Sequence, residues 1–270
     1  MDLTDQLNCV ITQCIQVSPM MKIIKVKPDG WKFPEFEAGQ FVALGLPPDY
    51  PRCIESEDDF EPPKQGRLIR RAYSIASSSN EDTIEFYIRL VHSGQLTPRL
   101  FELKIGDRVW MGKKAVGIFT IDKLDTDRNI ILIATGTGLA PYMSMLRSNA
   151  LKRRGKIIIV HGARNSCDLG YSSELKLLAS MFTNFKYHPS ITRPGNEPAE
   201  WGGDTRYIGE IWKSGLVDEL LGFKPKPSDT DIFLCGNPNM ISDMKELVYP
   251  IGYKDHKKKS PGQLHAEEYY

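Results

Sequence analysis

The order of apolar runs, glycine turns and helical segments changes near the middle of the chain, and this change most constrains the fold. The apolar run 129–134 leads into a glycine turn at 135–140 and then into a helical segment at 141–152. The runs 156–161 and 165–182 repeat the order of strand and helix. Alternating strands and helices predict a parallel sheet, whose ligand lies beyond the carboxyl ends of its strands. Two further strands and a helix are expected at 185–191, 231–235 and 239–248.

The first half of the chain carries short β-rich runs that are separated by Pro, Gly and Asp. Such runs predict an antiparallel barrel or sandwich. Residues 47–66 are rich in Pro, Asp and Glu and lack apolar periodicity, so we expect a long surface insertion there. The domain boundary is expected near residue 124, which gives domains 1–124 and 125–270. The expected strands of the first domain are 9–17, 21–26, 41–46, 70–76, 83–91 and 108–112.

Composition excludes several classes of function. A chain of 270 residues with 41% hydrophobic and 26% charged residues is typical of a water-soluble globular protein. A formal net charge of +1 argues against bulk nucleic-acid binding. No run approaches the roughly 20 apolar residues that span a bilayer. Residues 1–18 lack the basic and long apolar regions of a signal peptide, so we expect a cytoplasmic protein without membrane attachment.

The cysteines are scattered along the sequence and form no Cys-x-x-Cys pair. This pattern excludes the usual spacing of zinc ribbons and iron–sulfur clusters, and it fits reduced thiols. We therefore expect no metal site, and a redox centre would have to be a bound organic cofactor. The five residues are Cys9, Cys14, Cys53, Cys167 and Cys235.

The sequence Arg71-Ala72-Tyr73-Ser74 lies on an expected strand. Alternation places Arg71 and Tyr73 on one face and the other two residues on the opposite face. A guanidinium on that face can grip a phosphate, and a phenol can stack on a flat ring. An ordinary exposed strand is the alternative interpretation.

A second motif follows the expected strand 83–91. The turn from Gly94 to Thr97, with Pro98 next, is typical of a helix start, whose backbone N–H groups can bind a diphosphate. A simple capped helix explains the same residues.

Two glycine turns follow strands of the second half. The first is the sequence from Ala134 to Pro141, and the second is Cys235-Gly236-Asn237-Pro238. Because the carboxyl ends of parallel strands share one edge of the sheet, both turns can line one crevice. Tight turns without a ligand, and an inert buried thiol at Cys235, are the alternatives.

These motifs, taken in order, resemble the ferredoxin–NADP reductase family, and most closely its bacterial branch. The resemblance extends over nearly the whole chain to the ending Glu267-Glu268-Tyr269-Tyr270. It implies an N-terminal six-stranded antiparallel β-barrel that binds FAD and a C-terminal α/β domain with a parallel sheet that binds NADP(H). It also implies hydride exchange between NADP(H) and FAD, and single-electron exchange with ferredoxin or flavodoxin.

The resemblance assigns flavin roles to residues of the first half. Arg71 would hold the FAD diphosphate, Tyr73 would stack on the flavin ring, and Ser74 would hydrogen-bond the ring nitrogen that accepts hydride. The remaining residues that the family pattern places in the FAD site are Ala72, Tyr87, Ile88, Arg89, Val91, Gln95, Leu96 and Thr97.

Residues of the second half would complete the reaction site. Ser74, Cys235 and Glu267 are the catalytic candidates by this resemblance. Tyr269 would cover the second face of the flavin ring and Tyr270 would lie near the adenine, although the tail could equally be a frayed end. Further nucleotide-binding candidates at the glycine turns are Gly136, Thr137, Gly236 and Asn237.

Charge favours NADP over NAD. Arg164 ends the second strand of the nucleotide domain where an NAD site commonly has a carboxylate, so we expect it to meet the 2'-phosphate. Many relatives have Gly-Arg before an apolar residue where this chain has Arg206-Tyr207-Ile208, so the position of a second phosphate-binding arginine is open. The other residues assigned to this part of the site are Ala163, Thr192, Arg193 and Arg206.

The expected partner is an acidic ferredoxin or flavodoxin, and the expected state is a monomer. Lys254 and the run 257–259 can steer such a carrier, or they are a solvated lysine-rich loop. Three other functions stay open: the reductase component of an oxygenase system, a cytochrome b5 reductase-like enzyme, and a non-catalytic flavin or nucleotide sensor.

Overall fold

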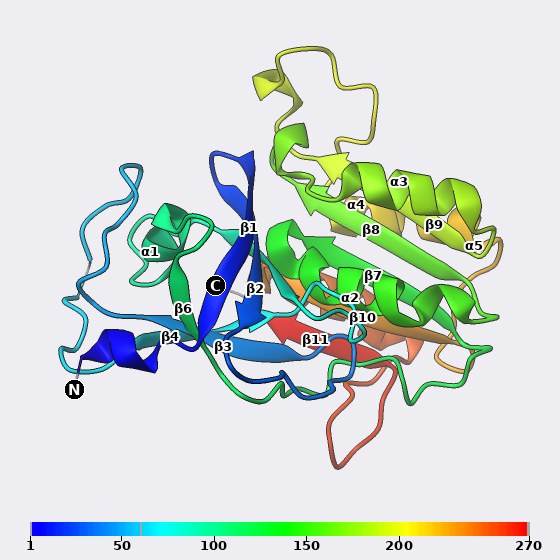
Figure 1. Cartoon of the computed structure of the whole chain (residues 1–270). Helices are drawn as coiled ribbons and strands as arrows, with labels where there is room; N and C mark the ends of the chain where they lie inside the picture. Colours follow the sequence, from blue (N-terminus) through cyan, green and yellow to red (C-terminus); the bar gives the residue numbers. More distant parts are fainter. Residues whose placement is uncertain (1, 60, 269–270) are drawn as a thin grey trace. The chain divides into compact units, whose positions relative to one another are not determined.

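A computed structural model describes residues 2–59 and 61–268. The chain divides into two compact units, Met1–Thr120 and Ile121–Tyr270. The boundary expected near residue 124 stays a prediction, and the structure's own division falls after Thr120. Each unit has its own sheet (Figure 1).

The first unit is an antiparallel barrel. Its six strands are ordered β4-β3-β6-β1-β2-β5, and a bridge between Ile75 and Phe86 joins the two ends of this order. The barrel that the family resemblance implied is therefore confirmed. Its elements are β1 (Cys9–Ser18), β2 (Met21–Pro28), β3 (Phe41–Leu46), β4 (Ile69–Ser74), β5 (Ile84–Arg89), α1 (Thr97–Glu102) and β6 (Arg108–Met111).

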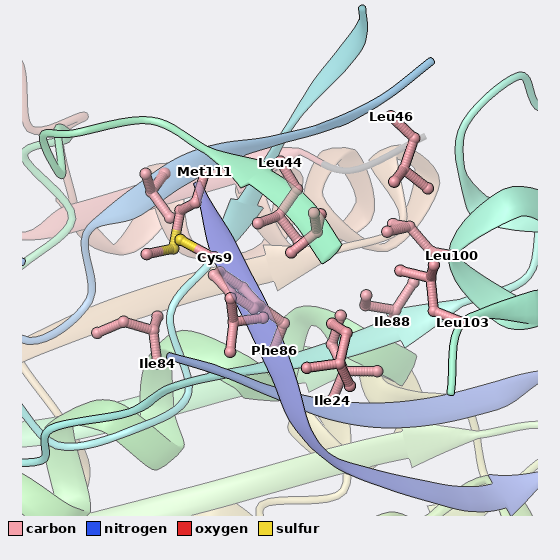
Figure 2. Packing of buried hydrophobic residues seen from close by; sticks show 14 of the residues in the cluster. Cys9, Ile24, Leu44, Leu46, Ile84, Phe86, Ile88, Leu100, Leu103 and Met111 are labelled. Carbon is pink, nitrogen blue, oxygen red and sulfur yellow. The ribbon is translucent and has the colours of Figure 1, made fainter. Parts of the chain in front are cut away.

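Alternating apolar residues of these strands fill the barrel. Ile24, Leu44 and Phe86 have no exposed surface and lie in one cluster. Leu100 and Leu103 join the same cluster and bring the α1 segment against Ile24 and the neighbouring strands (Figure 2). Burying side chains of this size stabilises the fold by about 1.5–3 kcal/mol each.

A buried lysine holds the end of α1 to β2. The Lys22 ammonium donates to the carbonyl oxygens of Phe101 at 2.7 Å and Leu103 at 2.8 Å. These carbonyls lie in the last turn of α1 and at its C-cap, where backbone acceptors lack intrahelical partners. Burial lowers the pKa of Lys22.

The second unit has a five-stranded parallel sheet in the order β11-β10-β7-β8-β9. Helices α4, α5 and α6 contribute to one buried cluster with the sheet, while α2 and α3 lie on the opposite face (Figure 1). The predicted parallel sheet is thus confirmed. Its elements are β7 (Asn129–Thr135), α2 (Ala140–Ser148), β8 (Ile157–Ala163), α3 (Ser172–Met181), β9 (Phe185–Ile191), α4 (Ile208–Lys213), α5 (Leu216–Leu221), β10 (Thr230–Gly236), α6 (Pro238–Val248) and β11 (Leu264–Glu268).

Some elements differ from the sequence prediction. The helix expected at 165–182 begins only at Ser172, because Tyr171 before it has a left-handed backbone with φ of 63°. Helices α4 and α5 and strand β11 had no predicted counterpart. The insertion 47–66 has no helix or strand in its described residues, as expected.

Replacing Lys22 tests how α1 is held. We expect Lys22→Met to lower the free energy of unfolding by about 1–3 kcal/mol, because buried carbonyls lose their donor. Urea unfolding would measure this, with Lys27→Met on the exposed side of the same strand as the control. Equal stability of Lys22→Met and the wild type would contradict the proposed role.

Candidate functional site

Arg71 and Tyr73 share one face of strand β4. Across the antiparallel pair they lie opposite Leu44 and Val42, whose side chains belong to the barrel core. Directly opposed residues point to the same side of a sheet. The guanidinium and the phenol therefore lie on the side that carries the core, where the barrel leaves Arg71 exposed.

The Tyr73 ring is half-buried and held by an aromatic contact. Its centroid lies 6.4 Å from that of Phe86, with the rings at 72° in an edge-to-face arrangement. Burial raises the pKa of the Tyr73 hydroxyl well above its usual range, so the ring stays a neutral phenol. Ser74, the next residue, is buried.

The structure brings β4 together with the turn that follows β5. Arg71 Nη2 donates to Gln95 Oε1 at 3.3 Å. The Thr97 hydroxyl accepts from the Val91 N–H at 3.0 Å and lies 3.3 Å from the Val91 carbonyl oxygen. Thr97 therefore fastens the segment just after β5 to the start of α1.

Backbone N–H groups are available as donors at Gln95, the hydrogen-bond partner of Arg71, and at the residues that follow it. Within residues 2–59 and 61–268, the N–H groups of Gln95, Leu96 and Thr97 have no hydrogen-bond acceptor. Pro98 follows, so the turn ends without another donor. Successive free amides next to a guanidinium fit a diphosphate.

Other predicted flavin residues separate into buried and exposed groups. Tyr87, Ile88 and Leu96 have buried side chains, and the last two lie in the barrel core. Arg89 and Val91 are exposed, as is Ala72.

In the second unit, the glycine turns after β7 and β10 pack directly on each other. A Cβ on Gly138 would lie 2.1 Å from the Cys235 carbonyl oxygen. A Cβ on Gly236 would lie 2.2 Å from Thr135 Oγ1, the atom that accepts the Asn237 N–H at 2.8 Å. Only glycine fits at these positions, so both turns lie at one edge of the sheet.

The structure also pairs Cys235 with Glu267, on neighbouring strands β10 and β11. The Cys235 side chain has no exposed surface, and burial raises the pKa of its thiol well above the usual range. Cys235 is therefore a neutral thiol rather than a nucleophile. Tyr269 and Tyr270 lie outside the described residues.

His161 is a functional candidate that the sequence motif contained but did not single out. It is buried in β8, with Nε2 3.3 Å from the Gly136 carbonyl oxygen and Nδ1 3.3 Å from the Tyr187 hydroxyl. Burial lowers the pKa of His161 to about 4. The neutral ring can then donate from Nε2 to Gly136 and accept from Tyr187.

Arginines gather at the carboxyl ends of β8 and β9. The Thr192 N–H donates to the Ala163 carbonyl at 3.0 Å, and the Arg193 N–H donates to the Arg164 carbonyl at 2.9 Å. Both arginine side chains are exposed and have no carboxylate partner in the described part of the chain. They are available to an anion.

Arg206, in contrast, is paired. Its Nε and Nη2 atoms donate to Asp204 at 2.9 Å and 2.5 Å, and His188 Nε2 lies 2.9 Å from the same carboxylate. These partners hold the pKa of Asp204 well below its usual range, with the Arg206 hydrogen bond as the main cause. The Ser190 hydroxyl donates to the Arg206 carbonyl at 2.6 Å, which ties the loop to β9.

Two family models match the two units. A model of the oxidoreductase FAD-binding domain matches residues 60–118, and a model of the oxidoreductase NAD-binding domain matches residues 132–246. No helix in residues 2–59 and 61–268 is long and apolar enough to span a membrane.

Curated relatives extend over most of the chain. It is 30% identical over 262 residues to a flavodoxin/ferredoxin–NADP reductase of Buchnera aphidicola, covering 92% of this chain and 97% of the relative. It is 31% identical over 229 residues to a ferredoxin–NADP reductase of Azotobacter vinelandii, covering 81% of this chain and 80% of the relative.

The fold is similar to that of a ferredoxin NADP+ reductase from Neisseria gonorrhoeae, solved with bound FAD and NADP. The TM-score is 0.80 at 24% sequence identity, covering 97% of each chain. This similarity supports the fold of both units.

His161 gives the free energy of unfolding a defined pH dependence. Its pKa is lower in the folded chain than the ordinary 6.5, so the unfolded chain binds the proton first as the pH falls. We expect His161 to remove up to about 1.4 kcal/mol of stability per pH unit as the pH falls from 6.5 to about 4, and little more below that.

Urea unfolding of the wild type and His161→Gln at pH 7.5 and pH 5 measures this contribution. Glutamine keeps a donor for Gly136 but does not titrate, so the variant should lose less stability on acidification. The same loss in both proteins would show that His161 does not titrate as described.

Proposed function

The chain belongs to the flavodoxin/ferredoxin–NADP reductase family, and on this premise we propose that it is an FAD-dependent reductase. In this function it exchanges hydride with NADP(H) and single electrons with ferredoxin or flavodoxin. Bound FAD supplies a ring that takes up two electrons together and releases them one at a time.

The observation that carries the proposal is the anion site on the barrel. An exposed Arg71 lies beside Gln95, and the amides of Gln95, Leu96 and Thr97 have no acceptor among the described residues. A diphosphate would satisfy these donors. Tyr73 would then orient the flavin ring, and the Ser74 hydroxyl would hydrogen-bond its hydride-accepting nitrogen.

In the nucleotide unit, the glycine turns would hold the NADP(H) backbone at the edge of the sheet. Gly136 and Thr137 on one turn, and Gly236 and Asn237 on the other, would admit the cofactor close to the main chain. Cys235 would shape the site as a neutral thiol, because its pKa is raised by burial. Glu267 would keep a carboxylate beside it.

Arg164 and Arg193 would bind the 2'-phosphate that distinguishes NADPH from NADH. Both are exposed and free of carboxylates in the described residues, whereas Arg206 already pairs with Asp204. A guanidinium binds a phosphate through paired hydrogen bonds, and only NADPH carries the 2'-phosphate. Loss of one of these arginines should therefore weaken the binding of NADPH and not that of NADH. Ala163 and Thr192 would support these arginines through their backbone bonds.

The proposed setting is a cytoplasmic monomer that meets a small acidic carrier. The free thiols of its five cysteines fit a reducing compartment. Lys254 and the lysines at 257–259 are exposed and would steer such a carrier.

Steady-state assays with the FAD-loaded chain test the proposal. NADPH should drive reduction of ferricyanide and of a bacterial ferredoxin or flavodoxin, and NADH should serve much less well. Bound flavin without any turnover would instead indicate a flavin sensor.

Arg164→Ala should lower kcat/KM for NADPH by roughly 10-fold to 100-fold and leave the value for NADH nearly unchanged. The control is Arg154→Ala, which removes an exposed arginine from the loop before β8, where its partner is Asp127 of the loop before β7. An unchanged ratio of NADPH to NADH activity in Arg164→Ala would remove this residue from the site.

A further inference from the structure

The insertion 47–66 is fastened to the turn before α1 by charged side chains. The Asp59 carboxylate accepts a hydrogen bond from Arg52, within the insertion. It accepts another from Arg99 of α1, whose Nη2 lies 3.0 Å from Asp59 Oδ2. All three side chains are largely buried, with exposed fractions of 13%, 16% and 5% for Asp59, Arg52 and Arg99. Ion pairs withdrawn from water in this way are stronger than exposed pairs.

Each arginine bridges the insertion and the turn. Arg52 donates to the carbonyl oxygens of His92 at 2.9 Å and Gly94 at 3.0 Å. Arg99 donates to the Gln95 carbonyl at 2.6 Å and, from the same guanidinium, to the Pro48 carbonyl at 2.7 Å. Asp59 thus binds both guanidinium groups that donate hydrogen bonds to the carbonyl oxygens of the turn.

The hydrogen bonds from Arg52 and Arg99 to these carbonyls fix the direction of the N–H groups in the turn. The chain has no cis peptide bonds among its described residues, and a planar trans peptide points its C=O and the next N–H in opposite directions. Because the Gly94 and Gln95 carbonyls face the arginines, the N–H groups of Gln95 and Leu96 point away from them. These are amides that have no acceptor in the described chain.

The insertion also orients the Gln95 side chain. Gln95 Nε2 donates to the Glu61 carbonyl at 2.9 Å, which leaves Oε1 to accept from Arg71 Nη2 at 3.3 Å. The insertion therefore acts on both the backbone donors and the guanidinium of the proposed diphosphate site.

We propose that the described residues of the insertion, 47–59 and 61–66, form a strap that presets the FAD diphosphate-binding turn, and that Asp59 is its positioning residue. This inference rests on the proposed FAD-dependent function. Without the Asp59 carboxylate, Arg52 and Arg99 lose the one charged partner that they share, and the amides of Gln95 and Leu96 are held less firmly in their common direction. FAD then has to order the turn as it binds, which weakens binding.

The test compares FAD with riboflavin, which has the ring but no phosphate. Flavin-fluorescence titrations of the full chain, freed of flavin, give Kd for both ligands. Asp59→Asn should raise Kd for FAD roughly tenfold and leave Kd for riboflavin within about twofold. The matched control is Asp58→Asn, because Asp58 is the exposed neighbour with the same side chain.

Two further variants separate positioning from loss of folding. Asp59→Glu keeps the carboxylate and should recover most of the FAD affinity. Arg52→Met leaves the Asp59–Arg99 pair intact and should also weaken FAD selectively, so it serves if Asp59→Asn does not fold.

Each outcome decides one claim. A wild-type chain that binds no FAD overturns the proposed function itself. If the wild type binds FAD, the strap is rejected when the folded Asp59→Asn, or Arg52→Met in its place, binds FAD as tightly as Asp58→Asn. It is also rejected when FAD and riboflavin affinities fall in equal proportion, because that would report general loosening of the barrel.

Discussion

A planar trans peptide points its carbonyl and its following N–H in opposite directions, and this constraint organises the turn at residues 94–97 and the turn at residues 136–137. In the barrel, arginines hold the carbonyls of Gly94 and Gln95, so the following amides face the other way. In the nucleotide unit, His161 lies 3.3 Å from the Gly136 carbonyl, so the Thr137 N–H points away from the histidine. Each unit thereby uses buried polar side chains on one side of a turn to direct backbone donors to the other.

Six arginines near the two proposed phosphate sites divide into two groups with different roles. Arg52, Arg99 and Arg206 bind carboxylates, and they fix loops. Arg71, Arg164 and Arg193 are exposed and have no carboxylate partner in the described residues, so their charge is available to phosphates. Pairing, rather than the number of arginines, therefore decides which positions favour an anionic cofactor.

Much of the fold was predictable because its signals are local. Apolar runs ended by glycine placed β7 and β10, and alternation placed Arg71 and Tyr73 on one face of β4. Strand β11 was missed because Leu264–Glu268 is short and polar, and it depends on pairing with β10. Sequence patterns carry little information about a strand that its neighbour stabilises.

The sequence motifs marked the positions of the candidate site but not their chemical state. The motifs located Cys235, whereas its complete burial, which keeps the thiol neutral, follows from tertiary packing. The insertion 47–66 gave no periodic signal. Its Asp59 pairs with Arg52, 7 residues earlier, and with Arg99, 40 residues later, and the second pair forms only in the folded barrel. The pairing of Arg206 with Asp204 depends likewise on how one loop folds.

The most direct measurement of the central claim is the visible absorbance of the FAD-loaded chain, mixed without oxygen with one equivalent of NADPH or NADH. If both units bind their cofactors as described, NADPH should bleach the flavin band rapidly and NADH should do so far more slowly. A chain that takes up no FAD, or whose flavin band is unchanged by NADPH, would contradict the account.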